Sequence, residues 1–182
     1  MTSGEAGVPE QHDEVVLAAD TAEQMRAIAT DVIAPHLRAG DLLILTGDLG
    51  AGKTTFTQGL GAALGVRGPI ASPTFIIART HPSEVGGPAL IHVDAYRLNS
   101  LAELDDLDLD TTLDDSVTVV EWGEGKAESL AADRLHVRIA RERGGTLDMA
   151  NPEGGRRELH MSAYGPRWLG IDLTRGPVGD LG

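Results

Sequence analysis

The sequence predicts a single α/β domain in which helices flank a mixed parallel and antiparallel sheet. Short runs of aliphatic and β-branched residues alternate with segments of helical spacing, which is typical of a sheet covered by helices. One pair of these runs is joined by a connection too short for a helix, so two of the strands are expected to be antiparallel. The length of 182 residues suits one domain with its own hydrophobic core.

The composition limits the class of protein. Acidic residues outnumber basic ones by 28 to 15, and the formal net charge of −13 argues against binding DNA or RNA through the bulk surface, since such binding requires phosphate neutralisation. The absence of cysteine excludes disulfides, thiolate catalysis and cysteine-ligated zinc. No apolar run approaches the roughly 18 residues of a membrane span, and no signal peptide is recognisable. We therefore expect a cytoplasmic protein with neither a membrane nor a DNA partner.

The predicted domain spans 14–163 and follows a polar lead, 1–13, that is expected to be disordered. A helix is expected over 20–40, because apolar residues recur there at helical spacing, and Pro35 should disturb its last turn. A second helix is expected over 54–64 with one buried face. The residues predicted on that face are Phe56, Leu60, Ala63 and Leu64.

The predicted strands have the apolar or alternating pattern of half-buried and fully buried strands. They are expected at 14–19, 41–46, 75–80, 89–95, 116–122, 133–140 and 156–163. The short connection 81–88 makes its two flanking strands antiparallel, and glycine-rich turns make the last two strands a hairpin. From Tyr164 onward Gly and Pro recur, so 164–182 is expected to be a loose tail with Trp168 and Leu169 tucked onto the body.

The stretch Gly-Asp-Leu-Gly-Ala-Gly-Lys-Thr-Thr at 47–55 matches the phosphate-loop pattern G-x-x-x-x-G-K-S/T without a mismatch. The glycines let successive backbone N–H groups point at one anion, and the helix that follows adds a partial positive charge. Lys53 places an ammonium beside the β- and γ-phosphates, and Thr54 offers a hydroxyl to Mg²⁺. The residues expected to bind a nucleoside triphosphate are Gly47, Asp48, Leu49, Gly50, Ala51, Gly52, Lys53, Thr54 and Thr55.

Two acids end predicted strands, where hydrolytic sites of this kind need a carboxylate near Mg²⁺ and a group that positions water. Asp94 and Glu121 each follow an apolar run, and a buried acid there is costly without a cation or donors nearby. His92 lies two residues before Asp94 on the same strand face, so it either orients that acid or is a structural histidine. Trp122 either belongs to the core or covers the site.

A further segment follows the phosphate-loop helix at the place where GTPases keep a switch that senses the γ-phosphate. It consists of Ser72, Pro73, Thr74 and Phe75. Thr74 is a candidate for sensing the γ-phosphate or the metal. Ser-Pro-Thr is also an ordinary turn sequence, so the residues alone leave both interpretations open.

Four motifs in this order resemble the TsaE (YjeE) family. They are the phosphate loop, Ser72-Pro-Thr-Phe75, His92-Val-Asp-Ala-Tyr-Arg-Leu98 and Val120-Glu-Trp122. The resemblance implies a bacterial Mg²⁺-dependent ATPase needed to form threonylcarbamoyladenosine (t6A) beside the anticodon of tRNA. The implied partner is the TsaB–TsaD pair, which ATP hydrolysis would reset, and tRNA would be reached only through that complex.

Carried over by residue, the resemblance assigns Mg²⁺ to Thr54 and Glu121 and a role in hydrolysis to Asp94, beside Lys53. It makes 72–75 switch-like and places Trp122 beside the nucleotide. Relatives also contact the nucleotide through a threonine early in the first helix. Thr21 and Met25 compete for that position, and Thr21 is the residue we carry over. The chain after Ala140 matches no motif of the family.

Other phosphate-loop proteins fit less well. A small-molecule kinase usually has an arginine-rich lid, whereas the segment after Tyr96 is acidic. A GTPase would carry an N-K-x-D motif to read guanine, and none occurs in the sequence. An ATP-binding regulatory switch without transferase activity remains an alternative, although the pair Asp94 and Glu121 favours hydrolysis.

Overall fold

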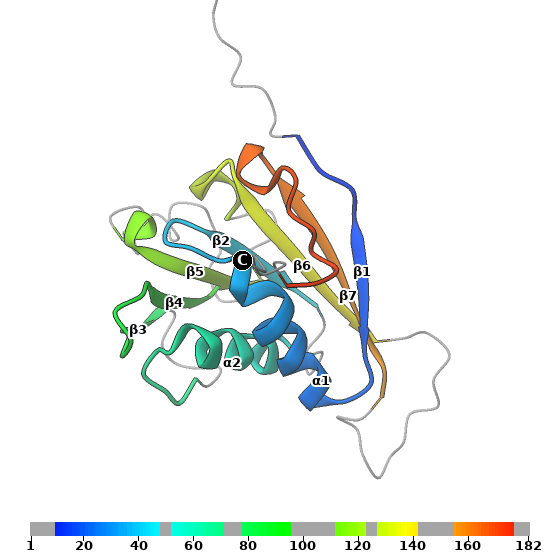
Figure 1. Cartoon of the computed structure of the whole chain (residues 1–182), viewed down its shortest axis with the longest axis horizontal. Coiled ribbons are helices and arrows are strands. Elements are labelled where there is room, and N and C mark those ends of the chain that lie inside the picture. The colour runs from blue at the N-terminus through cyan, green and yellow to red at the C-terminus, as the bar shows by residue number, and fades with distance from the viewer. Residues whose placement is uncertain are drawn as a thin grey trace, which may run out of the picture.

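A seven-stranded mixed sheet forms the body of the protein in a computed structural model that describes residues 10–47, 52–70, 78–95, 112–122, 127–141 and 155–176. The strand order is β1-β7-β6-β2-β5-β4-β3 (Figure 1). The strands are β1 (Val15–Ala19), β2 (Leu42–Thr46), β3 (Ala78–His81), β4 (Ala89–Asp94), β5 (Ser116–Glu121), β6 (Arg134–Arg141) and β7 (Arg157–Tyr164). The predicted α/β class with a mixed sheet is confirmed.

The centre of the sheet is parallel and its two flanks are antiparallel. β2 runs parallel to β6 and to β5, and β5 runs parallel to β4. β3 pairs with β4, β7 with β6, and β1 with β7 in antiparallel register. The two antiparallel pairs predicted from short or glycine-rich connections are both present. The carboxyl ends of β2, β5 and β4 consequently meet at one edge, where ligand crevices form in open α/β sheets.

Two helices pack against the same face of this sheet. They are α1 (Ala22–Ala27) and α2 (Lys53–Leu64), which lie against each other (Figure 1). The chain continues from α1 through a π-helical turn, Ile28–Ile33, and a 3₁₀ turn, Ala34–His36. Pro35 lies in the 3₁₀ turn and lacks the N–H that would continue an α-helix, as predicted. Further 3₁₀ turns lie at Leu113–Asp115, Glu128–Leu130 and Pro166–Trp168.

The hydrophobic core has one layer on each side of the sheet. The layer beneath the helices combines α1 and α2 with alternate residues of the strands, and the layer on the other face is smaller. Phe56 and Leu60 are fully buried as predicted, but Ala63 is exposed. The prediction for Ala63 was wrong: the residue lies in the last turn of α2, beyond Gly61, the last residue of the helix that is buried. None of the described helices is long and apolar enough to cross a membrane.

α1 and α2 approach each other at a glycine. A Cβ atom on Gly59 would lie 2.7 Å from the carbonyl oxygen of Arg26 and 2.8 Å from the Cβ of Ala29. The Thr30 hydroxyl donates to the carbonyl oxygen of Gly59 across the same contact, at 3.1 Å. The close packing holds the end of α1 and the π-helical turn after it against the middle of α2.

The chain after β7 packs onto the domain, so the prediction of a loose tail was wrong for residues 164–176. Tyr164 ends β7, and Trp168 and Leu173 are buried, with 2% and 4% of their surfaces exposed. Leu169, which was expected to tuck onto the body, is instead 70% exposed. The remainder of the predicted tail, 177–182, lies outside the described residues.

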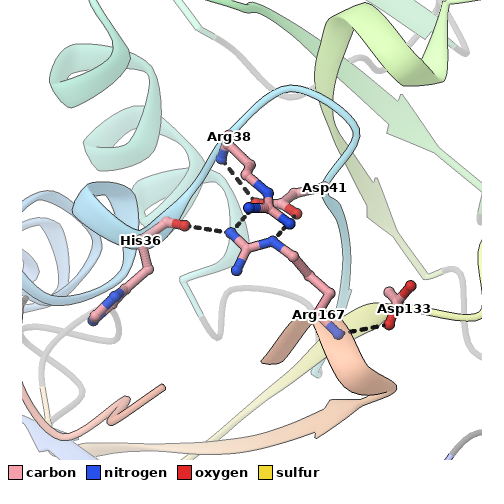
Figure 2. Close-up of polar contacts among 5 residues, drawn as sticks. All are labelled: His36, Arg38, Asp41, Asp133 and Arg167. Carbon is pink, nitrogen blue, oxygen red and sulfur yellow. Dashed lines mark hydrogen bonds and ion pairs between the residues drawn. The ribbon is translucent and has the colours of Figure 1, made fainter. Parts of the chain in front are cut away.

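An ion pair anchors this segment (Figure 2). The Arg167 guanidinium donates to both carboxylate oxygens of Asp41, each at 3.0 Å, and to the carbonyl oxygen of His36 at 2.6 Å. The Asp133 carboxylate accepts the backbone N–H of Arg167 at 2.9 Å, and Asp41 also accepts that of Arg38 at 2.8 Å. The side chains of Arg167 and Asp41 are 10% and 4% exposed, so this is a buried bidentate pair.

The last part of the predicted disordered lead also pairs with the sheet. The backbone N–H of His12 donates to the carbonyl oxygen of Ala163 at 2.9 Å, and that of Gly165 donates to Glu10 at 3.0 Å. Disorder was therefore the wrong prediction for 10–13, because backbone pairing does not require apolar side chains. Residues 1–9 lie outside the described part of the chain.

We predict that Arg167→Leu lowers the free energy of unfolding by about 3–5 kcal/mol, because the substitution leaves the Asp41 carboxylate buried without its cation. Urea denaturation measures the effect. Arg175→Leu is the matched control, since its ion pair with Asp172 is exposed, and it should cost no more than about 1 kcal/mol. Equal losses in the two variants would contradict the anchoring role.

We also predict that Gly59→Ala lowers the free energy of unfolding by about 1–3 kcal/mol, because the added methyl group meets the backbone of α1. Thermal or urea unfolding measures this loss. Gly87→Ala is the control, because the nearest atom to its Cβ position is the Ser83 Oγ, at 3.8 Å. A Gly59→Ala protein as stable as the wild type would show that α1 can move away freely.

Candidate functional site

The phosphate-loop motif lies between the end of β2 and the start of α2. Gly52 caps α2 with a φ of 113°, Gly47 has a φ of 149°, and Lys53 is the first residue of the helix. Positive φ values of this kind favour glycine. The predicted strand before the motif and the predicted helix after it are both present, while the loop residues Asp48, Leu49, Gly50 and Ala51 lie outside the described residues.

The side chain of Lys53, at the start of α2, is held by two contacts. Its Nζ donates to the carbonyl oxygen of Gly47 at 2.7 Å and lies 4.2 Å from the centroid of the Trp122 ring. The residue is only 7% exposed. Thr54 and Thr55 follow in the first turn of α2 and are half-buried. A positive charge is therefore fixed at the helix N-terminus, where an anion is favoured.

The two predicted acids lie at the same edge of the sheet. The parallel register pairs Glu121 with Leu45 on one side and with Asp94 on the other. The backbone N–H of Ala95 donates to the Glu121 carbonyl oxygen at 2.9 Å, and that of Trp122 donates to Leu45 at 2.9 Å. Glu121 is buried and Asp94 is half-buried. Glu121 thus lies directly beside β2, the strand that precedes the phosphate-loop motif, and Asp94 lies one strand further out at the same edge.

His92 lies against Glu121. The Nε2 of His92 is 3.2 Å from the Oε2 of Glu121, and the two side chains are 1% and 3% exposed. The sequence left open whether His92 orients Asp94, which shares its strand, or is a structural histidine. The contact with the neighbouring strand could not be read from the sequence without the register of β4 against β5.

The other oxygen of Glu121, Oε1, is buried and completes no hydrogen bond with the described residues. A buried carboxylate oxygen without a donor carries a desolvation cost that a cation would remove. Carboxylate and hydroxyl oxygens are the ligands that Mg²⁺ prefers, and Thr54 supplies the hydroxyl in the first turn of α2. The available donors therefore fit Mg²⁺.

Trp122 covers Lys53 rather than filling the core. It has a φ of 60°, which is uncommon for a residue with a large side chain and costs about 1–3 kcal/mol. Its backbone N–H donates a hydrogen bond to the carbonyl oxygen of Leu45. Its half-buried ring lies against the Lys53 ammonium. The sequence left open whether Trp122 belongs to the core or covers the site, and this geometry favours the second interpretation.

Other predicted site residues are less closely tied to this edge. Thr21 is exposed and caps α1, where its hydroxyl oxygen accepts the N–H of Gln24 at 3.1 Å. Its competitor Met25 is buried, and its Cε would lie 3.3 Å from a Cβ on Gly52. The helical spacing that marked Met25 as a core residue did not indicate its contact with the phosphate loop. The predicted switch residues Ser72, Pro73, Thr74 and Phe75 lie outside the described residues.

Comparison with known proteins shows to which family the chain belongs. Residues 19–147 match the family model described as "Threonylcarbamoyl adenosine biosynthesis protein TsaE". The chain belongs to the TsaE family. The match covers α1, the phosphate loop, both strand-end acids and Trp122, so the family is supported by the part of the chain that holds the site.

Individual relatives agree with this assignment to the TsaE family. The chain is 56% identical to the tRNA threonylcarbamoyladenosine biosynthesis protein TsaE of Streptomyces coelicolor over 143 residues, which cover 78% of this chain and 93% of that protein. It is 41% identical to the protein of the same name from Bacillus subtilis over 120 residues, which cover 65% and 73%. The crystal structure of Bacillus subtilis YdiB superimposes with a TM-score of 0.65 at 31% identity, covering 86% of this chain and 89% of that one.

The contact between Lys53 and Trp122 can be measured by fluorescence. In a Trp168→Phe background Trp122 is the only indole, because the sequence has two tryptophans. We predict that Lys53→Met changes the emission intensity of Trp122, since the ammonium lies over its ring. Arg26→Met, on the exposed side of α1, should leave the emission unchanged. Identical spectra for both variants would exclude the contact in solution.

Proposed function

We propose that the protein is a Mg²⁺-dependent ATPase of tRNA threonylcarbamoyladenosine formation that acts on the TsaB–TsaD complex in the cytoplasm. The observation that carries the proposal is that the Lys53 ammonium lies over the ring of Trp122, the residue after Glu121, while Glu121 and Asp94 end neighbouring strands at the same edge of the sheet. The names of the relatives support a role in tRNA threonylcarbamoyladenosine biosynthesis, and the phosphate-loop motif supports binding of a nucleoside triphosphate.

Binding of ATP would rest on the phosphate-loop motif and on the start of α2. The backbone N–H groups of the phosphate loop and the N-terminus of α2 would surround the phosphates, as in other proteins with this loop. Lys53 would exchange the carbonyl oxygen of Gly47 for phosphate oxygens. Trp122 would keep water away from the ammonium, which strengthens its attraction for the phosphate charge.

Hydrolysis would depend on the two acids. Thr54 and Glu121 would hold Mg²⁺, which neutralises charge that develops on the phosphates when it is bound. Asp94 is half-buried beside Glu121, so it can reach solvent and orient the attacking water. A residue in that role mainly affects the chemical step and has little effect on nucleotide affinity.

The action on TsaB–TsaD rests on the family. The net charge of −13 is unfavourable for holding tRNA directly, which supports contact with tRNA only through the complex. We infer that hydrolysis is slow in the isolated chain and rises when TsaB–TsaD is added. Reconstituted tRNA modification under multiple turnover tests this point, and an unchanged yield without this chain would refute the proposed role.

Two substitutions separate binding from hydrolysis. Lys53→Ala should weaken ATP binding by about 30-fold or more, because removing one partner of a buried charged contact costs about 2–5 kcal/mol. Glu121→Gln should retain ATP binding and lower the hydrolysis rate by about tenfold or more, about 1.4 kcal/mol in the barrier. Calorimetry measures the first effect and phosphate release the second. Arg26→Ala is the control for both.

Undiminished ATP affinity in Lys53→Ala would exclude the phosphate loop as the binding site. Full hydrolysis in Glu121→Gln would remove Glu121 from the metal site and favour an ATP-binding protein of another mechanism. Transfer of phosphate to a small molecule instead of to water would identify a kinase.

A further inference from the structure

We propose that His92 is a positioning residue for the metal site: it holds Oε2 of Glu121 and thereby leaves Oε1 available to the cation. The proposal rests on the proposed function, because it assumes a divalent cation at Glu121. It concerns a buried histidine that the nucleotide chemistry itself does not use.

The sheet register creates this contact. His92 pairs with Val119 of β5, and Glu121 lies two residues further along the same strand, opposite Asp94. Residues two apart on a strand point to the same face, so the His92 ring and the Glu121 carboxylate are diagonal neighbours. The resulting distance from Nε2 to Oε2 is 3.2 Å.

The burial of the His92 ring in an apolar layer carries a desolvation cost. Leu90 and Val119, the residues around His92 on that face, are fully buried and apolar. An aliphatic side chain would pack there without exposing polar atoms to an apolar layer, whereas buried polar groups are generally paired. Within the described residues, neither ring nitrogen of His92 completes a hydrogen bond, and the polar atom recorded nearest to its Nε2 is Oε2 of Glu121.

A small rotation of the Glu121 carboxylate would align Oε2 with a proton on Nε2. Such a bond would fix the carboxylate plane and direct it, as hydrogen-bonded partners of metal-ligating groups commonly do. The choice between Oε1 and Oε2 for the cation would then be set by His92. Loss of an outer partner of this kind typically lowers metal affinity by about 10–100-fold.

His81 is a matched comparison within the same sheet. It lies on β3, is also buried, and its Nδ1 is 3.0 Å from the carbonyl oxygen of Arg67. Burial lowers the pKa of His81, which is the behaviour of a histidine packed for structural reasons. The Nδ1 of His81 faces a backbone carbonyl rather than an acid of the site, so His81 is expected to have no effect on metal binding.

Three substitutions at His92 separate positioning from packing. His92→Gln keeps an N–H donor at a reach similar to that of Nε2. His92→Leu keeps much of the volume but removes the donor. His92→Asn keeps a polar amide whose shorter side chain ends near the position of Nδ1 and does not reach Glu121. Packing alone would make the Leu variant the best tolerated, whereas positioning would make the Gln variant the best functional substitute.

The experiment measures Mn²⁺ binding by electron paramagnetic resonance in the full chain, in the presence of a non-hydrolysable ATP analogue. Thermal unfolding and analogue affinity without metal are recorded for each variant. We expect His92→Leu and His92→Asn to weaken Mn²⁺ binding by about tenfold or more. We expect His92→Gln and the control His81→Gln to bind Mn²⁺ within about threefold of the wild type, with analogue affinity in the absence of metal unchanged throughout.

The proposal is overturned if His92→Leu and His92→Asn bind Mn²⁺ like the wild type, or if His81→Gln weakens binding equally. Should the Leu variant not fold, the comparison of His92→Asn with His92→Gln decides, and equal Mn²⁺ affinities in those two variants overturn the proposal. A wild-type chain that binds the analogue and Mn²⁺, with no difference among variants, rejects only the role of His92. A wild-type chain that binds no analogue rejects the proposed function and this inference together.

Discussion

The parallel pairing of β5 with β2 on one side and β4 on the other is the constraint on which the candidate site depends. It places Glu121 directly beside Leu45 and Asp94, so that three strands end together next to the phosphate loop. Backbone hydrogen bonds from Ala95 to Glu121 and from Trp122 to Leu45 continue the pairing beyond the strands. Displacement of β5 along its neighbours would separate the acid from the loop while leaving each strand intact.

Buried charged side chains lie at both ends of β2. Before its first residue, Asp41 binds Arg167 and so anchors the chain that follows β7 (Figure 2). After its last residue, Gly47 accepts a hydrogen bond from Lys53, which is covered by Trp122. The strand between them is apolar and fully buried over Leu42–Leu45. Both ends of the strand are thus held by charged groups in surroundings where water does not compete for them.

The sequence was sufficient to locate the helices and strands, but it was insufficient to predict how some of their residues pack. Period-two and helical patterns located the strands and helices to within a few residues, because they record which side chains must be buried. Ala63 has the spacing of a buried residue and is nevertheless exposed, because spacing identifies a helix face but not how far along the helix its neighbours cover that face. The packed segment 164–176 was missed because its anchor, Arg167, pairs with an acid far away in the chain.

By itself, the sequence determined the phosphate-loop motif, the α/β class, the two strand-end acids and the family, since these depend on local residue order and spacing. Only the tertiary structure decided that His92 lies against Glu121, that Trp122 covers Lys53, and that Met25 rather than Thr21 packs against Gly52. The physical reason is the same in each case. These contacts join residues on different strands or helices, and their geometry follows from sheet register and helix packing, which no local pattern encodes.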